Sequence, residues 1–212
     1  WENPEGVPIS AILVGGRRPT TIPLVHESLS WNHGVFMGSI MGSEVTAATI
    51  SDQIGQVRRD PFAMLPFIGY HVGDYLKHWI DIGKKYPDNH LPKIYYVNWF
   101  RKDAEGDFLW PGFGDNSRVL KWIFDRCDDK VGATSTPIGN VPKPEDLDVH
   151  GLTLKKDALK ELTKVDIDSW LKEVADIREY YEKIGEKLPN QMVQEIDALE
   201  QRLLLKKASS RK

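Results

Sequence analysis

Residues 98–116 read Asn-Trp-Phe-Arg-Lys-Asp-Ala-Glu-Gly-Asp-Phe-Leu-Trp-Pro-Gly-Phe-Gly-Asp-Asn, the most distinctive stretch of the sequence. Five aromatic side chains share this stretch with three glycines and a proline, a composition too broken for a continuous helix or strand and too aromatic for an ordinary solvated loop. Loops on rigid scaffolds concentrate binding residues, and aromatic rings offer flat contact area to planar ligands. We interpret the stretch as a loop that grips a planar ring, whose edge Asn116 reads. An aromatic plug in the core beneath a long loop is an equally good alternative at this point.

The overall composition is that of an ordinary soluble globular protein. The chain has 212 residues, of which 41% are hydrophobic and 28% charged, enough for one large domain or two small ones. Its formal net charge of −3 provides no basic field, so we expect neither nucleic acid nor a membrane as a partner. Cys127 is the only cysteine, which excludes an intrachain disulfide and fits a cytoplasmic location. A start at Trp1 rather than Met suggests a piece of a longer polypeptide.

A turn with two arginines follows the first predicted strand. Val7–Val14 is a short apolar run that ends in two glycines, a pattern typical of a buried strand and a turn. Glycines allow the backbone to approach a ligand closely, and a guanidinium fork matches phosphate oxygens. Arg17 and Arg18 are therefore candidates for phosphate contact, although a solvated turn with two surface arginines has the same pattern.

The segments between this turn and the aromatic stretch have less distinct patterns. Strand-forming residues predict a strand near Gly34–Ile40. Small polar residues predict a mobile Ω-type loop over Gly42–Gln56, either a lid or a surface excursion. Asp60-Pro61 has the composition of a helix start, and a proline and a glycine break that helix soon afterwards. Apolar spacing predicts a further helix from Val72 to about Lys85.

The spacing of histidines and cysteine predicts no metal centre. His71 and His78 lie seven residues apart. Metal ligands on one helix more often lie about three or four apart, so both histidines are interpreted as structural. Cys127 lies on an apolar stripe and is interpreted as a core residue rather than a nucleophile.

Regular elements on both sides of the aromatic stretch would hold it in place. Lys93–Phe100 is aromatic and β-branched, which predicts a strand that ends in the loop. An apolar face over residues 119–127 predicts a helix, with Asp115 or Asn116 as its N-cap. The run Pro-Gly-Phe-Gly-Asp-Asn would then lie at a helix N-terminus, where free backbone N–H groups can donate to a ligand.

The end of the chain is predicted to be helical. Gly132–Gly151 is rich in proline and glycine and is interpreted as a connector. Amphipathic spacing then predicts helices over Leu154–Leu162, Asp166–Lys187 and Pro189–Leu204, each with one buried stripe. The expected fold class is therefore α/β, with mixed strands and helices, finishing in amphipathic helices.

Five motifs, in this order along the chain, resemble one known family. They are residues 7–19 (Val-Pro-Ile-Ser-Ala-Ile-Leu-Val-Gly-Gly-Arg-Arg-Pro), 31–38 (Trp-Asn-His-Gly-Val-Phe-Met-Gly), 43–48 (Ser-Glu-Val-Thr-Ala-Ala), 60–64 (Asp-Pro-Phe-Ala-Met) and the aromatic stretch extended through Ser-Arg-Val to 119. Over nearly the whole chain the sequence resembles the C-terminal third of GTP-dependent phosphoenolpyruvate carboxykinase. That family converts oxaloacetate and GTP into phosphoenolpyruvate, GDP and CO₂ in gluconeogenesis, with manganese as cofactor, and is typically monomeric.

The resemblance implies a nucleotide-binding C-terminal domain. Residues 1–150 would form its nucleotide-binding α/β region and residues 151–212 a helical region of the same domain. Residues 44–55 match the family's Ω-loop lid, whose closure excludes water from a reactive enolate. Arg17 matches the family's catalytic arginine, which contacts the transferred phosphoryl group. A fixed cation there offsets charge in a transfer that depends on positioning and electrostatics.

The resemblance also implies a guanine pocket in residues 98–116. Phe100 and Phe113 would sandwich the base, with Phe108 at its edge and Trp99 supporting the pocket. The polar rim of the base would be read by Asn116 and by backbone groups around Gly112, Phe113, Gly114 and Asp115. Stacking contributes about 1–3 kcal/mol per base without choosing among bases, so the polar groups must make the choice.

Other parts of the family's active site have no match in this sequence. The Gly-Lys-Thr/Ser phosphate-binding loop with its reactive cysteine, the manganese ligands and the arginines that bind oxaloacetate are all expected upstream of Trp1. The family's lid histidine is unmatched as well, because Ile50-Ser51-Asp52 stands in that region. We therefore expect these residues alone to have no carboxykinase activity.

Two function classes compete with a carboxykinase fragment. A non-catalytic binder of single-stranded nucleic acid could use aromatic rings near Arg101 and Lys102, although the acidic net charge opposes this. A helical interaction module could use the C-terminal helices, but their apolar stripes are more simply explained as core.

Overall fold

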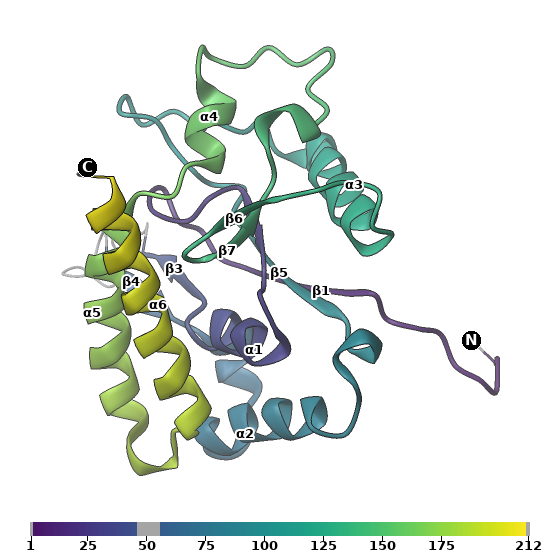
Figure 1. Cartoon of the computed structure of the whole chain (residues 1–212), viewed down its shortest axis with the longest axis vertical. Coiled ribbons are helices and arrows are strands. Elements are labelled where there is room, and N and C mark those ends of the chain that lie inside the picture. Colours follow the sequence, from purple (N-terminus) through teal and green to yellow (C-terminus); the bar gives the residue numbers. More distant parts are fainter. Residues whose placement is uncertain (1, 46–55, 211–212) are drawn as a thin grey trace.

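Alternating side chains of the strand β5 (Lys93–Val97) separate two hydrophobic cores. Successive side chains of a strand point to opposite faces of its sheet. Ile94 and Tyr96 belong to one core cluster, and Tyr95 and Val97 belong to the other. The computed structural model describes residues 2–45 and 56–210, and there β5 lies between two layers of helices (Figure 1).

Two sheets are present within the described residues. A five-stranded sheet has the order β1-β5-β2-β7-β6, and β3 and β4 form a separate hairpin. β1 runs parallel to β5 with Gly15 opposite Val97, whereas the other pairs are antiparallel. The remaining strands are β1 (Ala11–Gly15), β2 (Val25–Glu27), β3 (Gly42–Glu44), β4 (Val57–Arg59), β6 (Thr134–Thr136) and β7 (Gly139–Val141).

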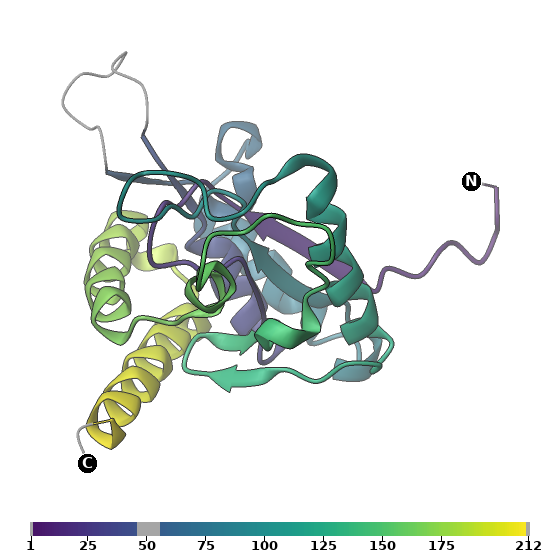
Figure 2. The ribbon, with the colours of Figure 1, turned by 90° about the horizontal axis from the view of Figure 1, so that it is seen from above.

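Helices cover both faces of the larger sheet. One core cluster contains residues of α1 (Trp31–Ser39), α2 (Val72–Gly83), α5 (Ile167–Ile184) and α6 (Asn190–Ser209). The other contains residues of α3 (Asn116–Cys127) and α4 (Ala158–Thr163). α5 and α6 pack side by side, and residues 2–10 extend away from the sheet (Figures 1 and 2). The predicted α/β class and the predicted C-terminal helices are thus confirmed.

The predicted strand near Gly34–Ile40 is wrong, because this segment lies in α1. The side chain of Ser30 accepts a hydrogen bond from the backbone N–H of His33 and caps the helix. Two glycines then let the helix pack closely. A Cβ at Gly34 would lie 2.6 Å from the Ile94 side chain, and one at Gly38 would lie 2.4 Å from the Phe62 ring.

The predicted helix at Asp60-Pro61 is also wrong. Short 3₁₀ turns occur instead at Pro61–Ala63 and Leu65–Phe67. Phe62 has a φ of 53°, which a continuing α-helix does not allow, and the Asp60 carboxylate accepts a hydrogen bond from the backbone of Leu65. The helix predicted from Val72 is confirmed as α2, and the side chain of His71 caps it by accepting from the Gly73 N–H.

Two further expectations are refined by the fold. Gly132–Gly151 is more than a connector, because it contains the β6–β7 hairpin, which extends the larger sheet. The predicted lid over 44–55 lies mostly outside the described residues. Its first residue, Glu44, is the last residue of β3 and lies opposite Val57 of β4. Among residues 2–45 and 56–210, no helix combines the length and apolar character needed to cross a bilayer.

Candidate functional site

A cleft opens where the parallel strands β1 and β5 both end. Its volume is about 420 Å³, within the range of small-molecule pockets. In α/β sheets, ligands bind outside the carboxyl ends of the strands. Residues from the β1 end, β3, β5 and the aromatic loop line the cleft: Gly15, Gly16, Arg17, Ser43, Val97, Trp99 and Phe100.

Two glycines set the spacing of the backbones at this cleft. A Cβ on Gly15 would lie 2.4 Å from the Val97 carbonyl oxygen, and one on Gly16 would lie 2.1 Å from the Gly42 carbonyl oxygen. Neither glycine has a positive φ, so the close approach of neighbouring strands is what requires them. The predicted Gly-Gly turn therefore brings β1, β3 and β5 together.

Arg17 has a fixed backbone and an exposed side chain. Its N–H donates to Ser43 Oγ at 3.0 Å, and its carbonyl accepts from the Glu44 N–H at 2.9 Å. Within residues 2–45 and 56–210 its guanidinium takes part in no ion pair, so it is available to an anion in the cleft. A phosphate contact by Arg17 stays a prediction.

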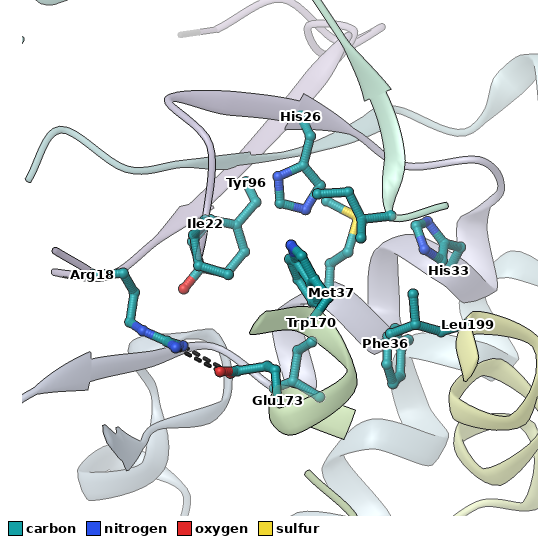
Figure 3. Close-up of a pocket in the computed structure, with 12 residues that line it drawn as sticks. Arg18, Ile22, His26, His33, Phe36, Met37, Tyr96, Trp170, Glu173 and Leu199 are labelled. Carbon is teal, nitrogen blue, oxygen red and sulfur yellow. Dashed lines mark hydrogen bonds and ion pairs between the residues drawn. The ribbon is translucent and has the colours of Figure 1, made fainter. Parts of the chain in front are cut away.

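Arg18, by contrast, is buried and structural. Its guanidinium donates twice to the Glu173 carboxylate of α5, at 2.8 and 2.6 Å (Figure 3). Arg59 of β4 pairs with the same carboxylate at 2.8 Å and also donates to the Ile40 carbonyl. Burial would raise the pKa of Glu173, but the two guanidinium groups outweigh it and hold that pKa at about 2. The turn at Arg17 and Arg18 is thereby tied to α5 and to β4.

The first half of the aromatic loop is anchored in the protein. Arg101 is buried and donates to the Glu161 carboxylate at 2.9 Å, which joins the loop to α4. The rings of Phe100 and Phe108 meet edge to face, with centroids 6.2 Å apart. Lys102 Nζ lies 5.0 Å from the Phe108 ring centroid. The loop thus folds back on itself and holds Phe108 beside a cleft residue.

The second half of the loop contains a strained and exposed aromatic residue. Phe113 has a φ of 50°, rare for a bulky side chain, and is 95% exposed. Strained backbone of this kind clusters at binding sites. Trp110, three residues earlier, is buried and donates its indole N–H to Asn116 Oδ1 at 2.9 Å. That bond fixes the Asn116 amide and leaves Nδ2 to donate elsewhere.

The helix that follows begins almost as predicted. Asp115 precedes α3, but its side chain makes no capping hydrogen bond and instead pairs with Arg118 at 3.0 Å. Ser117 Oγ donates to the Gly114 carbonyl. Asp115 therefore occupies the N-cap position of α3, but its side chain does not cap the helix.

The structure gathers the predicted site residues into two groups. Arg17, Trp99 and Phe100 line the cleft, and Phe108 contacts Phe100. The second group surrounds the N-terminus of α3 and includes Gly112, Phe113, Gly114, Asp115 and Asn116. A guanine held between Phe100 and Phe113 stays a prediction.

Other hollows suit a nucleotide less well. The interior pocket in Figure 3, lined by His26, Tyr96 and Trp170 among others, has a volume of about 10 Å³, room for one water molecule. A larger groove of about 660 Å³ lies between β4 and α5, where the charges of Asp176 and Glu179 are balanced by Arg59 and Lys183 and Tyr180 supplies a single aromatic ring. Within the described residues, no three His, Cys, Asp or Glu side chains are placed to hold a metal ion.

Sequence reasoning missed the buried ion network behind the turn. Arg18 was a candidate for phosphate contact, but its guanidinium is occupied by Glu173. The partners lie 155 positions apart in the chain, so no local motif joins them. The one available signal was Glu173 itself, an acidic residue on the apolar face predicted for Asp166–Lys187.

Comparison with known proteins agrees with the motifs. Residues 1–202 match the model of a family described as the phosphoenolpyruvate carboxykinase C-terminal P-loop domain. A protein of Treponema pallidum (strain Nichols) named phosphoenolpyruvate carboxykinase [GTP] is 62% identical over 204 residues, covering 96% of this chain and 33% of the relative. Relatives of the same name from Arthrobacter sp. (strain FB24) and Anaeromyxobacter sp. (strain K) are 53% and 52% identical, covering 96% and 97% of this chain and 33% of each relative.

The chain spans about a third of the length of these curated relatives. The match to the family model nevertheless covers almost all residues of this chain. The chain belongs to the phosphoenolpyruvate carboxykinase family and corresponds to its C-terminal P-loop domain.

Proposed function

We propose that this chain is the C-terminal part of a GTP-dependent phosphoenolpyruvate carboxykinase, and that it supplies the guanine pocket, a phosphate-contacting arginine and the lid. The whole enzyme would convert oxaloacetate and GTP into phosphoenolpyruvate, GDP and CO₂. The observation that carries the proposal is the cleft that places Arg17 beside Trp99 and Phe100 at the ends of two parallel strands. The names of the relatives support the same reaction.

Each group has a distinct physical role in this proposal. Arg17 offers a fixed cation to the transferred phosphoryl group, where positioning and charge provide most of the rate enhancement. Phe100 and Phe113 stack on the base, and Phe108 closes its edge. The Nδ2 group of Asn116, left available by Trp110, donates to a carbonyl oxygen of the base such as O6 of guanine. An amino group at that position, as in adenine, would leave the donor unpaired.

Manganese and the oxaloacetate-binding groups belong to parts of the enzyme that this chain does not match. The described residues hold no suitable cluster of metal ligands, so no residue here is assigned to the metal. We expect the 212-residue chain to bind GTP but to give no turnover with GTP, Mn²⁺ and oxaloacetate.

Competition binding tests the nucleotide assignment. A fluorescent GTP analogue bound to the chain should be displaced by GTP at a concentration at least about tenfold below that needed with ATP, because only the guanine rim pairs with the site. Equal displacement by both nucleotides would remove the guanine assignment. Tight binding of an oligonucleotide with steep salt dependence would favour the nucleic-acid alternative instead.

A charge variant separates the two ends of the site. Arg17→Ala should weaken GTP by about tenfold or more and leave guanosine nearly unchanged, because only phosphate loses a charge-assisted hydrogen bond. Arg178→Ala is the matched control, since Arg178 lies on α5 and pairs with Asp197 and Glu200. A similar loss in both variants would remove Arg17 from the phosphate site.

A further inference from the structure

The side chain of Asn98 lies at the junction of the two ends of the cleft. It follows β5 directly and is fully buried. A buried amide is costly unless its donors and acceptor are satisfied, so the partners of such a group show what it holds together. Phe100, the ring-facing residue of the cleft, is itself one of those partners, and Arg17, the phosphate-facing residue, directly precedes another.

Four hydrogen bonds satisfy the amide of Asn98. Its Oδ1 accepts from the N–H of Arg18 and from the N–H of Phe100, both at 3.2 Å. Its Nδ2 donates to the carbonyls of Arg18 at 2.7 Å and Ile22 at 2.9 Å. Both lone pairs and both N–H groups are therefore used.

These bonds connect two segments that are distant in sequence. Asn98 and Arg18 lie 80 positions apart, and the amide grips both the N–H and the carbonyl of Arg18, the residue directly after Arg17. The same oxygen holds the backbone of Phe100. The turn and the ring thus share one hydrogen-bonded centre behind the wall of the cleft.

We infer that Asn98 is a positioning residue that fixes the distance between the Arg17 turn and the Phe100 ring, so that one nucleotide can reach both at once. This inference rests on the proposed function. Asn98 does not line the cleft, so it acts through its neighbours and not by contact with the ligand. Its effect should appear in the advantage that GTP gains from having base and phosphates in one molecule.

The variant Asn98→Asp tests this at nearly constant volume. Its carboxylate can still accept from the N–H groups of Arg18 and Phe100, but it faces the carbonyl oxygens of Arg18 and Ile22 with no hydrogen to donate. The turn should shift relative to the ring. We expect the Kd of GTP to rise about tenfold or more, while the Kd values of guanosine and of tripolyphosphate, measured separately, change less than about threefold.

A control and a second variant keep the test decisive. Asn140→Ala removes a comparable amide on β7, where it donates to Glu27 at 3.2 Å, away from the cleft, and it should leave all three Kd values unchanged. If Asn98→Asp does not fold, Asn98→Ser, whose short hydroxyl cannot span the turn and the ring, is measured in its place.

The outcomes separate the two claims. A folded Asn98 variant that binds GTP as the wild type does overturns the positioning role. The positioning role is also overturned by a variant whose affinities for GTP, guanosine and tripolyphosphate all fall together with its melting temperature, because that is the result of general destabilisation. A folded wild-type chain that binds no GTP overturns the proposed function itself, and the inference with it.

Discussion

Trp110 and Phe113 are three residues apart in the same aromatic loop, yet their environments are opposite. Trp110 is 1% exposed and Phe113 is 95% exposed. Trp110 packs in the core shared with α3 and α4, while Phe113 stands out from the chain on a left-handed turn. One part of the loop is thus a plug in the core, and another part leaves an aromatic ring exposed. The buried part should determine stability, and the exposed part should determine binding.

Removing the buried ring should have the largest effect on stability. Trp110→Ala should lower the free energy of unfolding by about 3–5 kcal/mol, because it leaves a cavity in a close-packed core. Trp110→Phe should cost less and chiefly release Asn116 Oδ1. Urea denaturation of the three proteins measures this directly. A loss below about 1 kcal/mol for the alanine variant would mean that Trp110 is not part of the core.

Removing the exposed ring should affect binding and leave stability nearly unchanged. Phe113→Ala should change the free energy of unfolding by less than about 0.5 kcal/mol, because the ring has almost no protein contacts among the described residues. If the ring stacks on the base, GTP affinity should fall by about 1–3 kcal/mol, roughly 5- to 150-fold. Titration calorimetry with GTP gives the second number. Phe124→Ala, on an exposed face of α3, is the control that should alter neither quantity.

Acid should lower the free energy of unfolding through two buried histidines, without changing the aromatic rings proposed to stack on the base. Burial lowers the pKa of His26 and His33 to about 3. Because the folded-state pKa lies below the unfolded value of about 6.5, each histidine's contribution is intact above pH 6.5 and is lost as the pH falls toward 3. The free energy of unfolding should therefore drop between pH 7 and pH 5.5 by up to about 1.4 kcal/mol per pH unit for each histidine.

One substitution isolates a single histidine in that profile. The His26 ring stacks on Tyr96 with centroids 5.4 Å apart, and its Nδ1 has no hydrogen-bond partner among residues 2–45 and 56–210, so His26→Phe keeps the packing and removes the titration. About half of the histidine-dependent slope should disappear. An unchanged slope between pH 7 and pH 5.5 would show that His26 is not a source of the acid sensitivity. Glu173 does not contribute in this window, because the stability tied to its lowered pKa is lost only below about pH 4.5.

Periodic segments were predictable from the sequence, and glycine-dependent packing was not. The stripes of α2, α5 and α6 repeat at helical spacing, so their helices appear as expected. α1 was mistaken for a strand because its glycines suggest weak helix propensity, whereas in the structure they admit the Ile94 side chain and the Phe62 ring. β6 and β7 are three residues long each, too short for alternation to be visible.

The candidate site was predictable where one motif carried it. The Gly-Gly-Arg turn and the strand leading to Trp99 and Phe100 were placed correctly, and the cleft joins them. Composition could not show that Trp110 would be buried and Phe113 exposed, since it does not reveal the positive φ values at Gly112 and Phe113 between which the chain turns. It also could not show Asn98 as a junction, since its partners come from a distant turn.

Gly15 and Gly16 are required because there is no space for a side chain at either position. At both positions the nearest obstacle to a methyl group is a peptide oxygen of an adjoining strand, which cannot rotate aside as a side-chain tip can. Alanine is usually the mildest replacement, but its methyl group at position 15 would push β1 away from β5, and at position 16 it would push the chain away from β3. Mutational surveys that treat alanine as a neutral deletion would thus misjudge these two positions, where the smallest added carbon shifts whole strands.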